Sequence, residues 1–263
     1  MAITATQARS RETAEQRQQP RQRQAQFDDR IQAGRQLAQN LREYTGDSSQ
    51  VVVVSVSRGG AIVGAEVAAQ LGTGMQHLYY QVRAIPCPSI PRLSLGSVAG
   101  DGSVRIDSMM ARSMGVDEMN ADLLRRIAIV DRKLRRDQNA FHLPPPTRSQ
   151  VDGRTLIIVD DVIEAGDTIR EAAMHLRHFF DPRNVVVAAP VCLADLRKLL
   201  RRHVDAVVDI ASPLFVGPAA RWYAGNTTPT LAEQRLLSQM FTGGPDSTGA
   251  DVGQSGADPD IGG

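Results

Sequence analysis

Cysteine is scarce in this chain of 263 residues, and neither sign of charge is in excess. The two cysteines, Cys87 and Cys192, lack the spacing of metal ligands and are consistent with a reducing compartment. The 30 basic residues nearly balance the 29 acidic ones, so a net charge of +1 provides no overall field that would attract nucleic acid. No apolar run is long enough to cross a bilayer. We therefore expect a cytoplasmic protein with neither a nucleic-acid nor a membrane partner.

The two ends of the chain have few large apolar residues. Residues 1–26 are rich in Gln and Arg, and residues 243–263 consist mostly of Gly, Asp, Ser and Pro. Neither segment can bury a core, so we expect both to be disordered. The first segment lacks the apolar region of a secretory signal and is a weak candidate for an organelle transit peptide. Residues 27–242 are left, which is about the length of one domain.

The most informative segment is Thr155–Thr168, with the sequence TLIIVDDVIEAGDT. Leu156–Val159 is short, apolar and mostly β-branched, which is typical of a strand buried on both faces of a parallel sheet, and Ile169–Phe179 has helical spacing. Asp160 and Asp161 therefore stand at the carboxyl end of a strand, where such sheets bind ligands. The start of the following helix offers unpaired N–H groups and about half a positive charge to an anion.

These residue types suit a phosphorylated sugar. Two adjacent carboxylates can accept hydrogen bonds from vicinal hydroxyls, and the backbone N–H groups of Glu164–Asp167 can surround a phosphate. Thr168 adds a hydroxyl donor. Alternatively, Thr168 and Glu171 form a T-x-x-E capping box, which would use that hydroxyl for the helix. A cap alone would need neither the acidic pair nor Gly166, so the phosphate site is favoured.

A second strand, turn and helix precede this segment. Val51–Ser57 is apolar, Ser57–Gly60 predicts a sharp turn, and Ala61–Leu71 has the composition of a helix of small residues. The Gly59–Gly60 pair would also suit any strand-to-helix turn that needs positive φ or close packing. The G-x-G-x-x-G dinucleotide fingerprint is absent, so this segment alone leaves the function open.

LIIVDDVIEAGDT resembles the signature with which type I phosphoribosyltransferases bind phosphoribosyl pyrophosphate (PRPP): a strand, two acids, two apolar residues and a small loop ending in Ser or Thr. Three further segments resemble an uncharacterised bacterial subgroup that has P-R-G-G, V-R-K and L-G-A-V at these places. They are Ser57-Arg58-Gly59-Gly60, Val82-Arg83-Ala84 and Leu95-Gly96-Ser97-Val98. The resemblance covers about residues 27–239, from an opening helix near Phe27 to a late segment that contains Trp222–Tyr223. An aromatic there would either lie near the acceptor base or serve packing.

The resemblance implies the role of each segment. Asp160 and Asp161 would hold the ribose hydroxyls. The 5-phosphate would bind the loop of Ala165, Gly166, Asp167 and Thr168, and the pyrophosphate would bind Arg58, Gly59, Gly60 and Arg83. Mg²⁺ would bridge pyrophosphate and ribose oxygens with few protein ligands. Glu164 stands where hypoxanthine-guanine members carry an acid near the purine, so we expect Glu164 and Asp161 to be the catalytic residues.

Four positions depart from the family pattern. Glu164 replaces the usual Thr, Ser, Ala or Asp, and Asp167 places a carboxylate in the phosphate loop, so its side chain must point outward if a phosphate binds. Ala84 stands where the subgroup has a cation, and Arg92 where it often has an acid. Arg92 either replaces the missing cation or is a solvated surface residue.

These departures keep two other classes of protein open. A regulator that binds PRPP or a nucleotide without catalysis is favoured by Ala84 and Asp167, and disfavoured by Arg58 and Glu164. A phosphatase of the HAD type needs D-x-D, which the sequence Asp160-Asp161-Val162 does not provide. We therefore expect an enzyme that transfers phosphoribosyl from PRPP to a nitrogen base of unknown identity, and we allow for a homodimer.

Strands and helices are expected to alternate in a doubly wound, mostly parallel α/β sheet. The expected strands are Val51–Val56, His77–Val82, Leu156–Val159, Val185–Pro190 and Ala206–Ile210, and the expected helices are Ala61–Leu71, Ile169–Phe179 and Leu193–Arg202. Residues 84–149, including a long charged helix at Met119–Phe141, would form a variable hood, which the resemblance implies is mobile and closes on the substrate. His175 and His178 lie three residues apart without a third ligand, so they do not indicate a metal site.

Overall fold

The computed structural model describes most of the expected domain. The described residues are 26–45, 50–72, 76–117, 120–139, 146–224, 233 and 236. Apart from Gln26, both tails that were expected to be disordered lie outside this part of the chain. No helix among the described residues is both long enough and apolar enough to cross a membrane.

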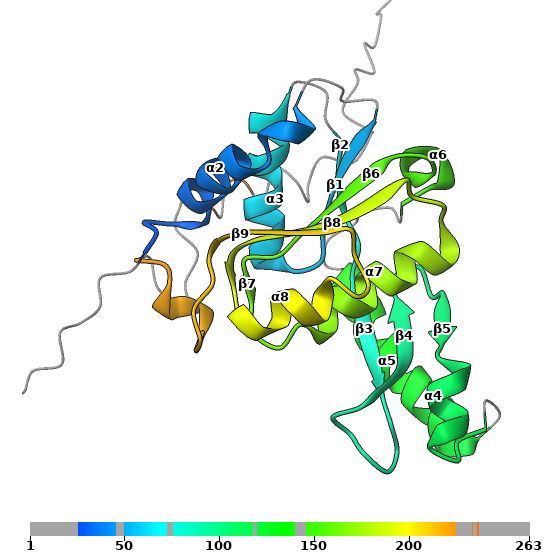
Figure 1. Ribbon diagram of the computed structural model, residues 1–263. Coiled ribbons are helices and arrows are strands. Elements are labelled where there is room, and N and C mark those ends of the chain that lie inside the picture. The colour runs from blue at the N-terminus through cyan, green and yellow to red at the C-terminus, as the bar shows by residue number, and fades with distance from the viewer. Residues whose placement is uncertain are drawn as a thin grey trace, which may run out of the picture.

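The central sheet is parallel throughout (Figure 1). Its strands are β1 (Val51–Ser55), β2 (Gln76–Tyr79), β6 (Thr155–Val159), β7 (Val162–Ile163), β8 (Asn184–Cys192) and β9 (Ala206–Ala211). Strands β2, β1, β6 and β8 are neighbours in that order, β9 pairs with β8, and the short β7 pairs with the last residues of β8. The predicted doubly wound α/β sheet is confirmed.

Helices cover both faces of this sheet, and strand alternation decides which side chains they meet (Figure 1). Val53 and Ile157 pack with α2 (Arg30–Asn40) and α3 (Arg58–Leu71), whereas Val54 and Ile158 pack with α7 (Asp167–Phe179) and α8 (Ala194–Leu200). All five residues of β1 and of β6 are buried, which explains why both strands are apolar without alternation.

The hood contains a second sheet of three antiparallel strands, β3 (Val82–Pro86), β4 (Ser94–Ala99) and β5 (Val104–Ile106). This sheet forms a separate apolar cluster with α4 (Ser108–Ser113) and α5 (Ala121–Asn139), and the whole unit extends away from the central sheet (Figure 1). The remaining short helices are α6 (Arg148–Val151), η1 (Arg42–Tyr44) and η2 (Ala219–Arg221). The hood begins at Val82, two residues before the predicted boundary.

The prediction of one strand at His77–Val82 was wrong. The chain leaves the central sheet after Tyr79 and enters the hood sheet at Val82. Between them, Tyr80 donates its backbone N–H to Ser55 at 2.9 Å and buries its ring completely. The apolar pattern continues across this junction because both sheets bury their residues, so hydrophobicity alone cannot locate the change of sheet.

The hood is fastened to α7 by buried polar groups. Arg105 of β5 donates from Nη2 to Glu171 of α7 at 2.5 Å, and the two side chains are only 8% and 3% exposed. His175 of α7 is fully buried between two hood hydroxyls, with Nδ1 2.9 Å from Ser97 and Nε2 2.8 Å from Ser103. These contacts tie β4, β5 and α7 together.

The hydrogen bonds around His175 define its tautomer. Ser103 donates its hydroxyl to Asp101 at 2.5 Å, so it must accept a hydrogen bond from Nε2–H of His175. Nδ1 is then the acceptor for the Ser97 hydroxyl. Burial lowers the pKa of His175 to about 4, because a charged ring would lose its solvation and one acceptor nitrogen.

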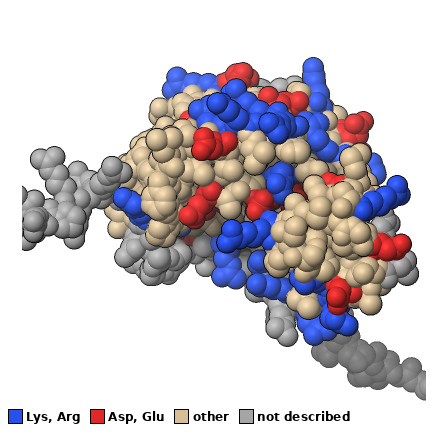
Figure 2. Space-filling model, turned by 60° about the horizontal axis from the view of Figure 1, so that its bottom comes forward, with Lys and Arg blue, Asp and Glu red and all other residues tan. Residues whose placement is uncertain are grey.

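Charges of both signs are mixed on the surface. Figure 2 shows groups of Lys and Arg side chains on one face of the molecule, with Asp and Glu between them.

Candidate functional site

Two loops at the carboxyl edge of the central sheet are in direct contact. Gly59 and Gly60 lie in the first turn of α3, and Asp160 and Asp161 follow β6. A Cβ atom on Gly59 would overlap the Asp161 carboxylate, and one on Gly60 would lie 2.7 Å from the backbone oxygen of Val159. Both glycines are therefore required by close packing, because any larger residue would push the two loops apart.

The predicted turn at Ser57–Gly60 was wrong in its extent. Helix α3 already begins at Arg58, and Ser57 is its N-cap, accepting a hydrogen bond from the Gly60 N–H at 2.9 Å. The first turn of α3 contains glycine because the loop after β6 packs too closely against it for a larger residue. Arg58 is consequently held at the start of a helix rather than on a flexible turn.

The Asp160 carboxylate is bound to both loops. Its Oδ1 accepts the hydroxyl proton of Ser57 from the loop after β1, and also the backbone N–H of Asp161 at 2.9 Å. Burial raises the pKa of Asp160, and the nearby charge of Asp161 raises it further. The side chain is thus oriented by protein groups before any ligand arrives.

The Asp161 carboxylate is held by an arginine that sequence reasoning missed. Arg30 of α2 donates from Nε to Oδ2 of Asp161 at 2.8 Å, and the two side chains are 11% and 13% exposed. The Arg30 backbone N–H in turn donates to Glu233 at 2.8 Å. Tyr223 lies under the Arg30 guanidinium, 4.5 Å from its ring centroid, and donates its hydroxyl to the Asp161 carbonyl at 2.9 Å. Arg30 and Tyr223 therefore fix Asp161 from one side.

The late aromatic pair serves packing in this structure. Tyr223 is 2% exposed and packs against Phe27, with the two rings tilted and their centroids 5.7 Å apart. Trp222 donates its indole N–H to the Val216 carbonyl at 2.9 Å. Of the two roles considered from the sequence, these contacts favour packing.

The loop after β7 leads into α7, which begins at Asp167, two residues before the predicted start at Ile169. Glu164 and Ala165 are exposed, and Gly166 has a left-handed φ of 73° as the N-cap of the helix. Asp167 and Thr168 are exposed in the first helical turn. Residues in a first turn have backbone N–H groups without partners inside the helix, so this turn can hold an anion.

The capping-box alternative is not formed. Gly166, not Thr168, is the N-cap, and Glu171 is turned toward Arg105. The Asp167 carboxylate lies 3.2 Å from the Arg170 guanidinium, so it points along the helix toward a cation. This orientation reduces its repulsion of an anion at the N-terminus.

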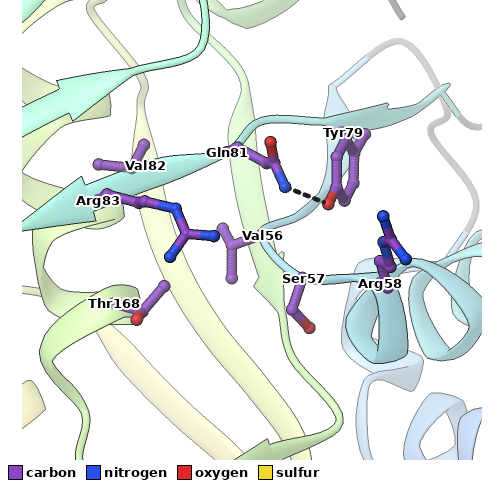
Figure 3. A pocket seen from close by; sticks show the side chains of 8 residues that line it. All are labelled: Val56, Ser57, Arg58, Tyr79, Gln81, Val82, Arg83 and Thr168. Carbon is purple, nitrogen blue, oxygen red and sulfur yellow. Dashed lines mark hydrogen bonds between the residues drawn. The ribbon is translucent and has the colours of Figure 1, made fainter. Parts of the chain in front are cut away.

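A pocket of about 380 Å³ opens between α3, α7 and the first strand of the hood (Figure 3). Its lining residues are Val56, Ser57, Arg58, Tyr79, Gln81, Val82, Arg83 and Thr168. Arg83 extends from β3 into the space above Thr168, and Arg58 points from the start of α3 toward Tyr79 (Figure 3). The volume lies in the usual range for small-molecule sites, about 300–1,000 Å³. Two guanidinium groups and a helix start make it suited to an anion.

The pocket lining includes only some of the residues selected from the sequence. Arg58, Arg83 and Thr168 line it, whereas Gly59, Gly60, Asp160 and Asp161 contact one another outside the lining. Glu164 is exposed in the adjacent loop and is not part of the lining. Ala84 pairs with Ser97 within the hood sheet, and Arg92 is exposed in the turn between β3 and β4. Arg92 is thus a surface residue in this structure.

The described residues contain no group of three or more His, Cys, Asp or Glu side chains that could hold a metal ion. His175 is occupied by its two serine partners, and His178 is exposed.

Known proteins resemble the chain in sequence and in structure. Two proteins of Mycobacterium tuberculosis, from strains CDC 1551 and ATCC 25618, are each named "Putative phosphoribosyl transferase" and are 31% identical over 236 residues. The predicted resemblance to the phosphoribosyltransferase family is confirmed. The match covers 89% of this chain and 51% of each relative, so the chain spans about half the length of these curated relatives. No protein-family model matches the sequence.

The fold agrees with a solved bacterial structure. The crystal structure of the protein TT1426 from Thermus thermophilus superposes with a TM-score of 0.68 and 26% identity. The match covers 82% of this chain and 98% of the Thermus thermophilus protein. The arrangement of this chain thus recurs over nearly the whole length of that protein.

Proposed function

We propose that this protein is a phosphoribosyltransferase that uses PRPP and Mg²⁺ to attach phosphoribosyl to a nitrogen base, with release of pyrophosphate. The observation that carries the proposal is the contact between the Gly59–Gly60 turn and the Asp160–Asp161 pair, beside a pocket lined by Arg58, Arg83 and Thr168. One edge of the sheet thus brings together two acids that can accept hydrogen bonds from hydroxyls, a helix N-terminus that can bind a phosphate, and two arginines that can bind a pyrophosphate. These are the groups that PRPP requires.

Each part of PRPP has a proposed partner. The 5-phosphate would bind the N–H groups and hydroxyl at the start of α7, from Ala165 through Gly166 and Asp167 to Thr168. The pyrophosphate would lie against the start of α3 at Arg58, Gly59 and Gly60, with Arg83 closing over it from the hood. Asp160 and Asp161 would accept the ribose hydroxyls. Since Asp161 is already paired with Arg30, we expect Asp160 to make the more direct contact.

The proposed chemistry is a displacement with inversion at the anomeric carbon. A nitrogen of the acceptor forms the new bond to this carbon as its bond to the pyrophosphate oxygen breaks, and the electron pair leaves with pyrophosphate. Arg58 and Arg83 would stabilise the growing negative charge on the leaving group. Mg²⁺, brought with the substrate, would neutralise part of the same charge. The exposed carboxylate of Glu164 would take the proton that the acceptor nitrogen loses.

A regulator that binds PRPP or a nucleotide without catalysis is the second candidate. Two observations favour this candidate: Ala84 of the hood sheet stands where the subgroup has a cation, and Arg30 is already paired with Asp161.

The proposal also includes a cytoplasmic location, supported by two buried free thiols at Cys87 and Cys192, and a homodimer, which light scattering in solution would test.

The deciding experiment is a screen of the purified protein with PRPP, Mg²⁺ and a panel of nitrogen bases, following pyrophosphate release. Wild type should turn over with at least one base, and Glu164→Gln should lower turnover by about 10² to 10⁴ while PRPP affinity stays nearly unchanged. Exposed Glu43→Gln on η1 is the matched control and should leave turnover unchanged. PRPP binding without transfer to any base would favour the regulator, and absence of PRPP binding would contradict both candidates.

A further inference from the structure

A second, larger pocket lies on the other half of α7, away from the proposed PRPP site. Its volume is about 630 Å³, and it shares no lining residue with the first pocket. It is formed by β5 of the hood, the second half of α7 and the segment between α8 and β9. Thr168 and Arg177 are nine residues apart on one helix, which separates the two sites by about 14 Å at 1.5 Å per residue.

Positive charge dominates this second pocket. Four arginines line it, Arg105, Arg177, Arg201 and Arg202, together with the imidazoles of His178 and His203. The one carboxylate in the lining, Asp205, is already paired with Arg177 at 2.5 Å and accepts the Val185 backbone N–H at 2.6 Å. Arg201 and Arg202 are exposed and have no carboxylate partner within the described part of the chain.

The deepest of these cations has an unused donor. Arg105 is 7% exposed, and Nη2 is taken by Glu171, but its buried Nε–H has no hydrogen-bond partner among the described residues. Leaving a buried donor without a partner is unfavourable, and more so for a charged group. Because Arg105 lines the pocket, its guanidinium contributes positive charge to the wall of the cavity.

We propose that this pocket, which we call the second anion site, binds a nucleotide that carries two or more phosphates. Several guanidinium groups around one cavity provide the forked donors that bind phosphate oxygens in pairs. The cavity volume is sufficient for more than a phosphate group, and Met174 and Val204 provide apolar surface against which a base can pack. The site requires no catalytic step and is independent of the function proposed for the first pocket.

The test isolates the second anion site by removing the first. In full-length protein carrying Arg58→Ala and Arg83→Ala, calorimetric titration with inorganic tripolyphosphate, ATP and GTP should show one binding site, and its affinity should fall as salt is raised. Adding Arg201→Ala and Arg202→Ala should weaken this binding at least tenfold, about the loss expected for one charge-assisted hydrogen bond. Adding Arg132→Ala and Lys133→Ala instead, which removes the same charge from the exposed face of α5, should leave it unchanged.

A second variant tests the buried donor. Replacing both Arg105 and Glu171 by Met removes the ion pair and its unused N–H while keeping the volume, an exchange that folded proteins often tolerate. This variant should melt close to wild type and bind the same probes at least tenfold more weakly.

Three results would overturn the proposal. Binding that disappears in the Arg58→Ala, Arg83→Ala protein belongs to the first pocket. Binding that is equal with and without Arg201 and Arg202 does not use the second anion site. Tripolyphosphate that binds as tightly as ATP and GTP would show that the pocket takes phosphate groups without the nucleoside.

Discussion

Arg30 and Asp161 are joined by an Nε–H···Oδ2 hydrogen bond of 2.8 Å, although 131 residues separate them in the chain. The pair connects the opening helix to the end of the strand that carries the acidic pair. Because both groups are largely buried, each depends on the other for its solvation. Asp161 is thus a preorganised part of the site, and α2 belongs to the site as much as the loops do.

Arg30→Met should therefore destabilise the protein and weaken PRPP binding together. Removing one partner of a buried ion pair typically costs about 3–5 kcal/mol, because the other charge is left buried. Thermal unfolding and PRPP titration measure the two effects. Arg35→Met is the matched control: its pair with Glu66 is 60% exposed on the arginine side and should contribute less than about 1 kcal/mol. Equal losses in the two variants would contradict a special role for Arg30.

Gly59→Ala should abolish tight PRPP binding with a smaller effect on folding. The new methyl group would overlap the Asp161 carboxylate and push the two loops apart. Alanine is favoured over glycine in a helix by up to about 1 kcal/mol, which offsets part of the strain in the free energy of unfolding. PRPP affinity and melting temperature distinguish the two effects. Ala69→Ser, which adds one atom on the exposed side of α3, should change neither.

Asp160 should make stability depend on pH in an unusual direction. Its folded pKa is raised by burial, so the folded state binds the proton more tightly than the unfolded chain. The stability that it contributes is present below the ordinary pKa of 3.8 and is lost as the pH rises from there toward the raised value. Asp160→Asn should thus gain stability relative to wild type across that window, as measured by melting temperature against pH. The same change at exposed Asp122 is the matched control.

His175 should make stability depend on pH in the opposite direction. Its pKa falls from 6.5 to about 4 on folding, so stability is lost as the pH falls through that window and the unfolded chain takes up the proton. His175→Gln should lower stability at neutral pH, since one buried hydrogen bond is lost, and should reduce the acid-induced loss. Part of that loss will remain, because the pKa of His77, whose ring is partly buried, is lowered to about 4 as well. His178→Gln, on the exposed side of the same helix, is the matched control.

Local pattern was sufficient to predict the two strands that carry the candidate site. Val51–Ser55 and Thr155–Val159 are buried on both faces, so their continuous apolar sequence predicts them directly. The acidic pair follows the second strand directly, and only the two-residue strand β7 separates it from the small loop. Their position at the carboxyl edge is then a consequence of parallel pairing.

Long-range contacts were not predictable in this way. Arg30 has the sequence context of any helical arginine, and only its distance from Asp161 shows its role. Glu171 resembled the second residue of a capping box with Thr168, because the spacing of residues in the sequence does not show that Arg105 approaches Glu171 from another sheet. The apolar run at His77–Val82 likewise does not show where the chain passes from one sheet to the next, since Tyr80 is buried at the junction itself.

The buried contacts of α7 with the hood bear on how this molecule opens locally. Glu171 and His175 satisfy groups on β4 and β5, so separating the hood from α7 would expose a charged pair and an imidazole with two broken hydrogen bonds. Such a cost joins neighbouring elements into one cooperative unit of unfolding. The backbone amides of β4, β5 and the middle of α7 should therefore exchange with deuterium at a common rate, and the hood should keep its protection for as long as the helix does.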